Sequence, residues 1–147
     1  MMDTTDMDII RCLQEDARLT MTAIGKAVGL SQPAVAERIK RLEEQGVIEK
    51  YTTIISSEKI GKPITAFMLV RTTNCIDFID YCTNSPQIVE CHRISGQYNY
   101  LIKIQVESTT VLEQVENSTL QYGTLQTLFT LSSPIPRKTL CVKEHIV

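Results

Sequence analysis

The chain has 147 residues, of which 43% are hydrophobic and 22% are charged, and its formal net charge is −2. This composition is typical of a folded globular protein and excludes a disordered tail. The slight acidity excludes a protein that coats nucleic acid with its whole surface, so a DNA site would have to be a local patch.

No apolar run approaches the roughly 18 residues that a membrane-spanning helix needs. The opening segment, residues 1–6, is acidic and lacks the basic and apolar regions of a signal peptide. We therefore expect a cytoplasmic protein without a membrane partner.

The five cysteines are at positions 12, 75, 82, 91 and 141, and none belongs to a Cys-x-x-Cys pair. With two histidines they offer no zinc-ligand set of the usual spacing. We expect reduced, mostly buried thiols, and neither a metal nor a cofactor.

Three helices are predicted in the first part of the chain. The first begins with Thr5 as its cap and ends near Asp16, with an apolar stripe of Ile9, Ile10 and Leu13.

The second helix is short. Thr20 can cap it, and Gly29 can close it because glycine readily takes a positive φ. Its apolar residues are Ile24, Ala27 and Val28.

The third helix is predicted from Ser31, its cap, to Gly46. Val35, Ile39 and Leu42 fall at i, i+4 and i+7 and form its inward face. Residues 47–55 then have the pattern of extended chain leading out of this domain.

The second part of the chain alternates predicted strands and helices. Strands are expected over residues 64–71, 88–94, 100–106 and 125–131, and helices over residues 76–82 and after Ser108. The inward residues of the first of these helices are expected to be Ile76, Ile79 and Tyr81.

The order β-α-β-β-α-β is that of a ferredoxin-like sandwich, with helices on one face of the sheet. The predicted fold class is α+β: an N-terminal three-helix domain containing a helix-turn-helix, followed by a ferredoxin-like βαββαβ sandwich. We expect the domains at residues 1–50 and 63–147, with residues 51–62 as a connecting strand or linker. The uncovered face of the sheet needs a partner, which predicts a dimer.

The second and third helices have the pattern of a helix-turn-helix. Gly25 is the small residue where the two helices would cross, and Gly29 supplies the turn. A three-helix bundle that binds nothing shares parts of this pattern and is the alternative.

The third helix carries the candidate DNA contacts, because a recognition helix reads base edges mainly from its N-terminal half. The candidate readers are Gln32, Pro33, Ala34, Glu37 and Arg38. Lys40 and Arg41 suit phosphates, and Ser31 with the first helical amides could hold another phosphate. The alternative is a solvated helix face with the i,i+4 ion pairs Glu37–Arg41 and Lys40–Glu44.

Residues 29–48 read GLSQPAVAERIKRLEEQGVI and resemble the Lrp/AsnC (feast/famine) transcriptional regulators. Residues 3–10 and 14–20 also resemble the corresponding parts of this family. The resemblance implies a helix-turn-helix domain, a connecting strand and a sandwich domain that dimerises through its sheets. It also implies that dimers assemble into tetramers or octameric rings, and that an amino-acid effector modulates DNA binding.

Residues 96–100, Gly-Gln-Tyr-Asn-Tyr, resemble the family's Gly-x-x-Asp-Tyr effector loop, so the implied effector residues are Gly96, Tyr98, Asn99 and Tyr100. Asn99 stands where the family commonly has Asp, and it offers an effector's ammonium only a neutral oxygen. The alternative is a tight hairpin in which Asn99 tolerates a turn conformation and Tyr100 packs inward.

The predicted function is a sequence-specific DNA-binding transcriptional regulator, a dimer-based oligomer and not an enzyme, with double-stranded DNA as its partner. One alternative is a nucleoid-associated architectural protein that bends or wraps DNA without an effector. Another is a ligand-sensing or siroheme-decarboxylase-like sandwich, because some proteins built like this family act with a histidine; His92 is the candidate residue for it here.

Overall fold

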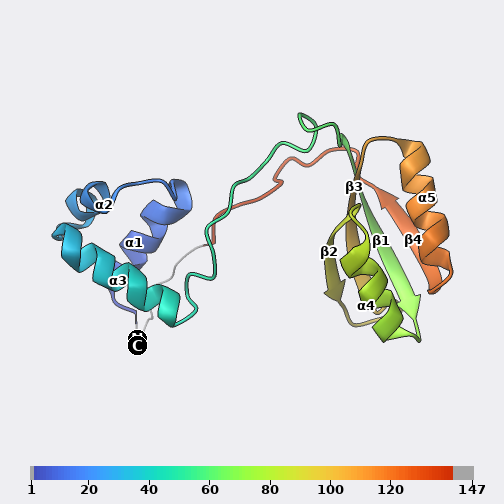
Figure 1. Ribbon diagram of the computed structural model, residues 1–147, viewed down its shortest axis with the longest axis horizontal. Helices are drawn as coiled ribbons and strands as arrows, with labels where there is room; N and C mark the ends of the chain where they lie inside the picture. Colours follow the sequence, from blue (N-terminus) through green and yellow to red (C-terminus); the bar gives the residue numbers. More distant parts are fainter. Residues whose placement is uncertain (1, 141–147) are drawn as a thin grey trace. The chain divides into compact units, whose positions relative to one another are not determined.

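The computed structural model describes residues 2–140. The chain divides into two compact units, one built on Met1–Thr53 and the other on Ile54–Pro134 (Figure 1). Within residues 2–140, no helix has the length and apolar character needed to cross a membrane.

Three helices make up the first unit: α1 (Thr4–Glu15), α2 (Met21–Val28) and α3 (Gln32–Glu44). Each contributes buried aliphatic side chains to a single core, namely Ile9, Ile24, Val35 and Ile39. Leu42 of α3 is fully buried as well. Burial of one such side chain stabilises a fold by about 1.5–3 kcal/mol, so this small core holds the three helices together.

The helix starts follow the predicted capping chemistry with one correction. Thr20 caps α2 and accepts a hydrogen bond from the backbone of Ala23, as predicted. The cap of α1 is Asp3 and not Thr5, because Asp3 and Asp6 form a reciprocal capping box that satisfies two backbone N–H groups. Ser31 occupies the N-cap position of α3, but its side chain makes no capping bond.

Burial in α2 differs from the prediction at one position. Ile24 is buried, whereas Ala27 is exposed and Gly25 is buried in its place. Gly25 is buried because it lies against Leu30 and Val35 in the neighbouring segments.

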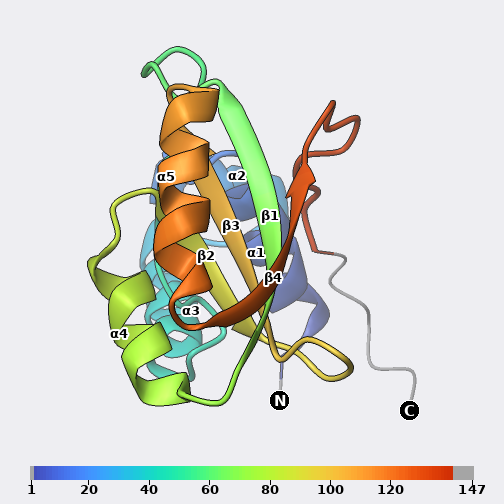
Figure 2. The ribbon, with the colours of Figure 1, turned by 90° about the vertical axis from the view of Figure 1, so that its right-hand side faces the viewer.

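The second unit is a four-stranded antiparallel sheet of order β2-β3-β1-β4, with α4 and α5 on one face (Figure 2). Its elements are β1 (Ile64–Thr72), α4 (Cys75–Asn84), β2 (Ile88–Arg93), β3 (Tyr100–Val106), α5 (Thr109–Leu120) and β4 (Gly123–Phe129). The predicted α+β fold class, a helix-turn-helix domain followed by a ferredoxin-like sandwich, is confirmed.

The inward face of α4 differs from the prediction. Ile76 is 82% exposed and Ile79 is 47% exposed, whereas Phe78 and Cys82 are buried, and Tyr81 packs against the core. The large ring of Phe78 fills the space under the sheet, with its centroid 5.0 Å from that of Tyr100. Filling this space with an aromatic ring rotates both isoleucines of the helix outward.

The sheet has two unlike faces. Alternate residues of the central strands, such as Met68 and Ile102, are buried under the helices, as strand geometry requires. The intervening residues form the open face, whose apolar members Phe67, Leu69, Leu101 and Leu128 are only partly buried or exposed. This open face is the unpartnered apolar surface that the sequence predicted.

Residues 45–63 join α3 to β1 without a helix or a strand. Tyr51 donates a hydrogen bond to Glu43 at 2.8 Å, while Ile54 and Ile55 are exposed. Residues 51–62 therefore form no connecting strand and are linker in this structure. The domain boundaries stay predictions.

The four cysteines among residues 2–140 are free, and no group of three or more metal-ligating side chains lies there. Cys82 is buried and Cys12 and Cys75 are partly buried, but Cys91 is exposed, so the prediction of buried thiols is wrong for Cys91. Cys141 lies outside the described residues.

Candidate nucleic-acid interface

The α2–α3 pair has the geometry of a helix-turn-helix. The Leu30 N–H donates to the Gly25 carbonyl at 2.9 Å, and a Cβ on Gly25 would stand 2.5 Å from the Leu30 carbonyl oxygen. Gly29 has φ of 72°, a conformation that side-chain-bearing residues rarely adopt. Both glycines therefore have the roles that the sequence assigned to them.

The N-terminal half of α3 presents polar side chains to solvent. Ser31, Gln32, Pro33 and Glu37 are exposed, and Ala34 is partly exposed. In residues 2–140 the carboxylate of Glu37 has no hydrogen bond or ion pair, so the Glu37–Arg41 pair of the solvated-face alternative does not form. The opposite side of α3 supplies three buried residues that hold the helix in place.

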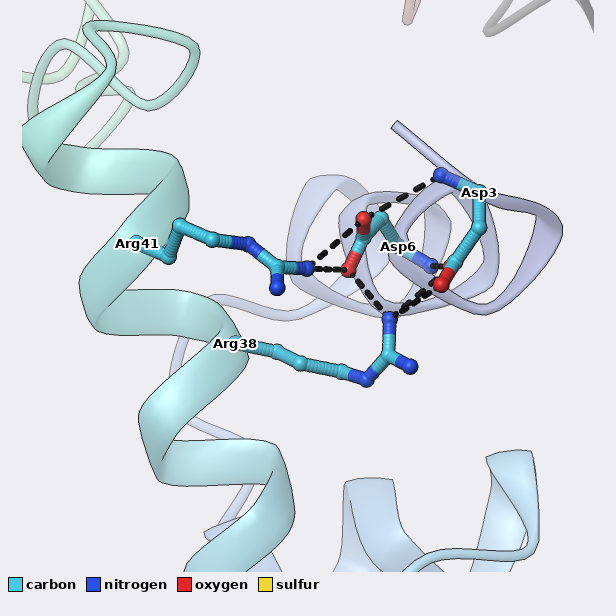
Figure 3. A network of polar contacts seen from close by, with 4 residues as sticks. All are labelled: Asp3, Asp6, Arg38 and Arg41. Atoms are coloured by element: carbon cyan, nitrogen blue, oxygen red, sulfur yellow. Dashed lines mark hydrogen bonds and ion pairs between the residues drawn. The ribbon is translucent and has the colours of Figure 1, made fainter. Parts of the chain in front are cut away.

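Two arginines of α3 turn toward two carboxylates at the start of α1 (Figure 3). Arg38 Nη1 contacts both carboxylates, at 2.7 Å from Asp3 Oδ2 and 2.7 Å from Asp6 Oδ1. Arg41 Nη2 lies 3.0 Å from each carboxylate oxygen of Asp6. We call these four residues the aspartate–arginine clamp.

Burial makes Asp6 the centre of this clamp. Its side chain is 1% exposed, compared with 25% for Arg38 and 48% for Arg41. A buried carboxylate is strongly unfavourable unless it is paired and hydrogen-bonded, and here two guanidinium groups and a backbone N–H satisfy it. The clamp therefore ties the recognition helix to the first helix.

The clamp also changes the charge that α3 presents. The hydrogen bond from Arg38 lowers the pKa of Asp3, and the same bond raises the pKa of Arg38. Two carboxylates offset two guanidinium groups, so the clamp has no net charge at neutral pH. Lys40 is 75% exposed and pairs only loosely with Glu44 at 3.7 Å, one of the two pairs expected for the alternative of a solvated helix face. It is the most accessible cation of the candidate set.

The predicted effector loop is held to the sheet by the Asn99 amide. Its Oδ1 accepts from the Thr72 N–H at 3.0 Å, and its Nδ2 donates to the Thr72 carbonyl at 2.8 Å. Gly96 and Tyr98 lie in the same loop, where Gly96 has φ of 120°. Tyr100 is 2% exposed beneath α4, in the core and away from the solvent side of the loop.

Two family models cover most of the chain: an AsnC-type helix-turn-helix domain matches residues 2–43, and an Lrp/AsnC ligand-binding domain matches residues 65–140. The HTH-type transcriptional regulator YezC of Bacillus subtilis is 42% identical over 132 residues, which are 90% of this chain and 95% of YezC. The solved structure of B. subtilis LrpC is 32% identical with a TM-score of 0.88, and the match covers 93% of this chain and 99% of that one. The chain belongs to the Lrp/AsnC family. It is therefore a DNA-binding transcriptional regulator with a ligand-binding domain.

The two hydrogen bonds between the Asn99 side chain and the Thr72 backbone, here called the Asn99 staple, explain why Asn replaces the Asp that is common at this position in the Lrp/AsnC family. An ionised Asp has only acceptor atoms and could not donate to the Thr72 carbonyl, whereas an amide supplies both the donor and the acceptor. Asn99 is thus matched to its backbone neighbour, and both of its polar atoms are already in use.

His92, the candidate of the enzymatic alternative, lies on the open face of the sheet opposite Leu101. Its Nε2 is 3.3 Å from Glu90 Oε2, and its side chain is 57% exposed. An exposed polar contact of this kind needs no catalytic explanation.

Sequence reasoning identified α3 but missed Asp3 and Asp6. A usable signal is present: two carboxylates three residues apart at a helix start, and two arginines, Arg38 and Arg41, three residues apart on another helix. Side chains at i and i+3 share a helix face, so two such pairs can meet when the helices pack.

Replacement of Asp6 by Asn should destabilise the first unit by about 2–3 kcal/mol, because both arginines lose a buried anionic partner. Breaking a fully buried ion pair costs roughly 3–5 kcal/mol, and the loss here is smaller because Arg41 is half exposed. Hydrogen exchange of the α1 and α3 amides measures this loss in that unit alone. Asp8→Asn is the matched control, since Asp8 makes only an exposed contact with Arg11 and should change stability by less than about 0.5 kcal/mol. Equal effects of the two substitutions would contradict the role of Asp6.

Replacement of Asn99 by Asp should lower the free energy of unfolding by about 1–3 kcal/mol at neutral pH, because the introduced carboxylate faces the Thr72 carbonyl. This contact raises the folded-state pKa of the introduced carboxyl above its unfolded value of about 3.9. Protonation lets the group donate again, so the deficit should shrink as the pH falls through the folded-state pKa and grow as it rises.

Urea unfolding of the two proteins at about pH 4.5 and about pH 7.5 measures this difference. Asn99→Ala is the control, because it removes both hydrogen bonds at every pH and should show the same deficit at both. A pH-independent deficit for Asn99→Asp would contradict the staple.

Proposed function

We propose that this regulator recognises double-stranded DNA sequence-specifically, with α3 in the major groove. The observation that supports this most directly is the exposed N-terminal half of α3, where Gln32 and Glu37 extend from a helix fixed by its core. Gln can pair with adenine and Glu can accept a hydrogen bond from cytosine, while Pro33 and Ala34 offer apolar contacts to thymine methyl groups.

The cations of α3 have different proposed roles. Lys40 binds phosphate, since it is exposed and only loosely paired. Arg41, half exposed in the clamp, has donors left for a second phosphate, and the free Ser31 hydroxyl with the first helical amides holds a third. Arg38 serves mainly to position α3, because its Nη1 already binds two carboxylates.

A single domain with so few phosphate contacts binds DNA weakly and loses affinity steeply with salt. We therefore propose a homodimer formed through the open face, where Leu69 lies between Leu101 and Gln126 in the register. Two copies of α3 would then contact successive half-sites. Further assembly into tetramers or octamers would let DNA bend around the particle, in the cytoplasm and at the nucleoid.

An amino acid is the proposed effector, bound near Gly96, Tyr98 and Asn99. The match of residues 65–140 to a ligand-binding domain supports an effector. Because the Asn99 side chain is already paired with Thr72, the effector would contact the backbone of the loop or Tyr98. The same pairing favours a second candidate function, an architectural protein that bends DNA without any effector.

Replacement of Glu37 by Ala should change sequence preference, with about a tenfold to hundredfold loss of discrimination at one base pair, because a base-reading contact contributes roughly 1–3 kcal/mol. Binding of the full chain to its own upstream DNA and to unrelated DNA measures this ratio. Glu44→Ala, at the far end of the same helix, is the control and should leave the ratio unchanged. Equal losses on all sequences would contradict base reading by Glu37.

Replacement of Lys40 by Ala should weaken binding to all sequences alike. It should also make the slope of log K against log salt shallower by about 0.9, the value for one released counterion. Salt titrations of the two proteins on the same DNA measure this slope, and an unchanged slope would contradict a phosphate contact.

Replacement of Leu69 by Asp should convert the dimer to a monomer, since it places a charge at the centre of the open face. Light scattering gives the mass in solution. Ile76→Asp is the control, because Ile76 is 82% exposed on α4, and this variant should remain at least dimeric. A parent protein that is already monomeric would overturn the assembly proposal.

A further inference from the structure

A cavity of about 510 Å³ lies between α4 and the edge strand β2, on the helix side of the sheet and apart from the effector loop. This volume is within the range of small-molecule sites, roughly 300–1,000 Å³. A β-bulge between Ile88 and Glu90 shapes its wall, because the extra residue keeps Cys91 and Arg93 on the helix side while Glu90 stays on the open face. Ile79 and Val89, two of the partly exposed apolar residues of this unit, line it.

One end of the cavity combines a free cation with an unsatisfied hydroxyl. Arg93 is the register partner of Tyr100, so the two side chains lie side by side on the same face of the sheet. Among residues 2–140 Arg93 makes no ion pair or hydrogen bond. The Tyr100 hydroxyl is buried beside the Cys75 thiol, a weak partner that raises the Tyr100 pKa, and it makes no hydrogen bond of good geometry with the described residues, a condition that costs about 1–3 kcal/mol.

The rest of the lining carries no free negative charge. Its carboxylate, Glu90, is already bound to Lys103 at 2.9 Å and to His92 at 3.3 Å. The Cys82 and Cys91 thiols stay protonated at neutral pH, since burial raises the pKa of Cys82 to about 12 and partial desolvation also raises the pKa of the more exposed Cys91. The cavity thus offers a cation and an apolar wall, but no unpaired carboxylate for an ammonium group.

We propose that this cavity binds a small aliphatic monocarboxylate that lacks an ammonium group. The carboxylate accepts hydrogen bonds from Arg93 and from the Tyr100 hydroxyl, a charge-assisted arrangement. The aliphatic part lies against Ile79, Ile88 and Val89. This site is distinct from the proposed amino-acid effector loop, and its ligand differs from an amino acid in charge.

Calorimetric titration of the full chain, without DNA, with 4-methylpentanoate, its neutral amide and leucine tests the site independently of the regulatory function. These probes share a carbon skeleton and differ in charge. We expect 4-methylpentanoate to bind with a Kd of about 1 mM or lower, which is within reach of a ligand of this size. The amide should bind at least about tenfold more weakly because it has no carboxylate to pair with Arg93. Leucine should bind at least about tenfold more weakly because its ammonium group finds no free carboxylate in the cavity and is desolvated there.

Variants and spectra locate the ligand. Arg93→Gln should weaken 4-methylpentanoate binding at least about tenfold, and Tyr100→Phe roughly threefold. Arg18→Gln, an exposed arginine in the other unit, makes the same charge change and should have no effect. Methyl NMR signals of Ile79 and Ile88 should shift on binding and confirm that the variants are folded.

Several results would overturn the proposal. These are the absence of 4-methylpentanoate binding up to about 10 mM, tighter or equal binding of leucine, and unchanged binding in folded Arg93→Gln. Unchanged binding in folded Tyr100→Phe would contradict the placement of the carboxylate.

Discussion

The buried carboxylate of Asp6 is the interaction on which the DNA-binding unit depends. It lies at the start of α1 with 1% of its side chain exposed, and it binds Arg38 and Arg41 of the recognition helix across more than thirty positions of sequence. A charge this deeply buried is stable only with these partners. The Asp6 carboxylate is therefore compensated only when α3 is packed in the position that brings Arg38 and Arg41 to it. In the proposed DNA complex, the contacts come from α3 residues that the clamp does not use, above all Gln32, Glu37 and Lys40.

The ligand-binding unit is organised by the two faces of one sheet. The helix face is filled around Phe78 and Tyr100, and where α4 meets the bulged edge strand the filling is incomplete and leaves the cavity beside Arg93. The open face keeps its apolar residues partly exposed, which suits a second copy of the sheet. Covering helices, a proposed dimer surface and a candidate small-molecule site therefore all follow from strand alternation in a βαββαβ fold.

The sequence predicted those features that depend on local chemistry. Thr20, Gly25 and Gly29 could be assigned because capping, close approach and positive φ each restrict the residue type at a single position. The fold class followed from the order of periodic segments, and α3 followed from its apolar spacing together with the family resemblance. These signals need no knowledge of distant partners.

The missed features depend on tertiary partners. In the sequence, Asp3 and Asp6 are two residues of an acidic N-terminal segment. Their role as partners of Arg38 depends on the packing of α3 against α1. Two faces of α4 carry apolar residues, so the sequence does not show which face points inward. Phe78 is buried, and Ile76 and Ile79 are exposed, because the space between α4 and the sheet fits the larger ring. The role of Asn99 requires the backbone of Thr72, which is 27 residues away in the chain.

A crystal structure of the full chain bound to its own upstream DNA tests the central claim most directly. The account predicts that the Asp6 carboxylate keeps its hydrogen bonds to Arg38 and Arg41, with Gln32 and Glu37 at the base edges and Lys40 at a phosphate. A complex in which both arginines leave Asp6 and contact base edges would contradict it, because the clamp would then be a feature of the free protein alone.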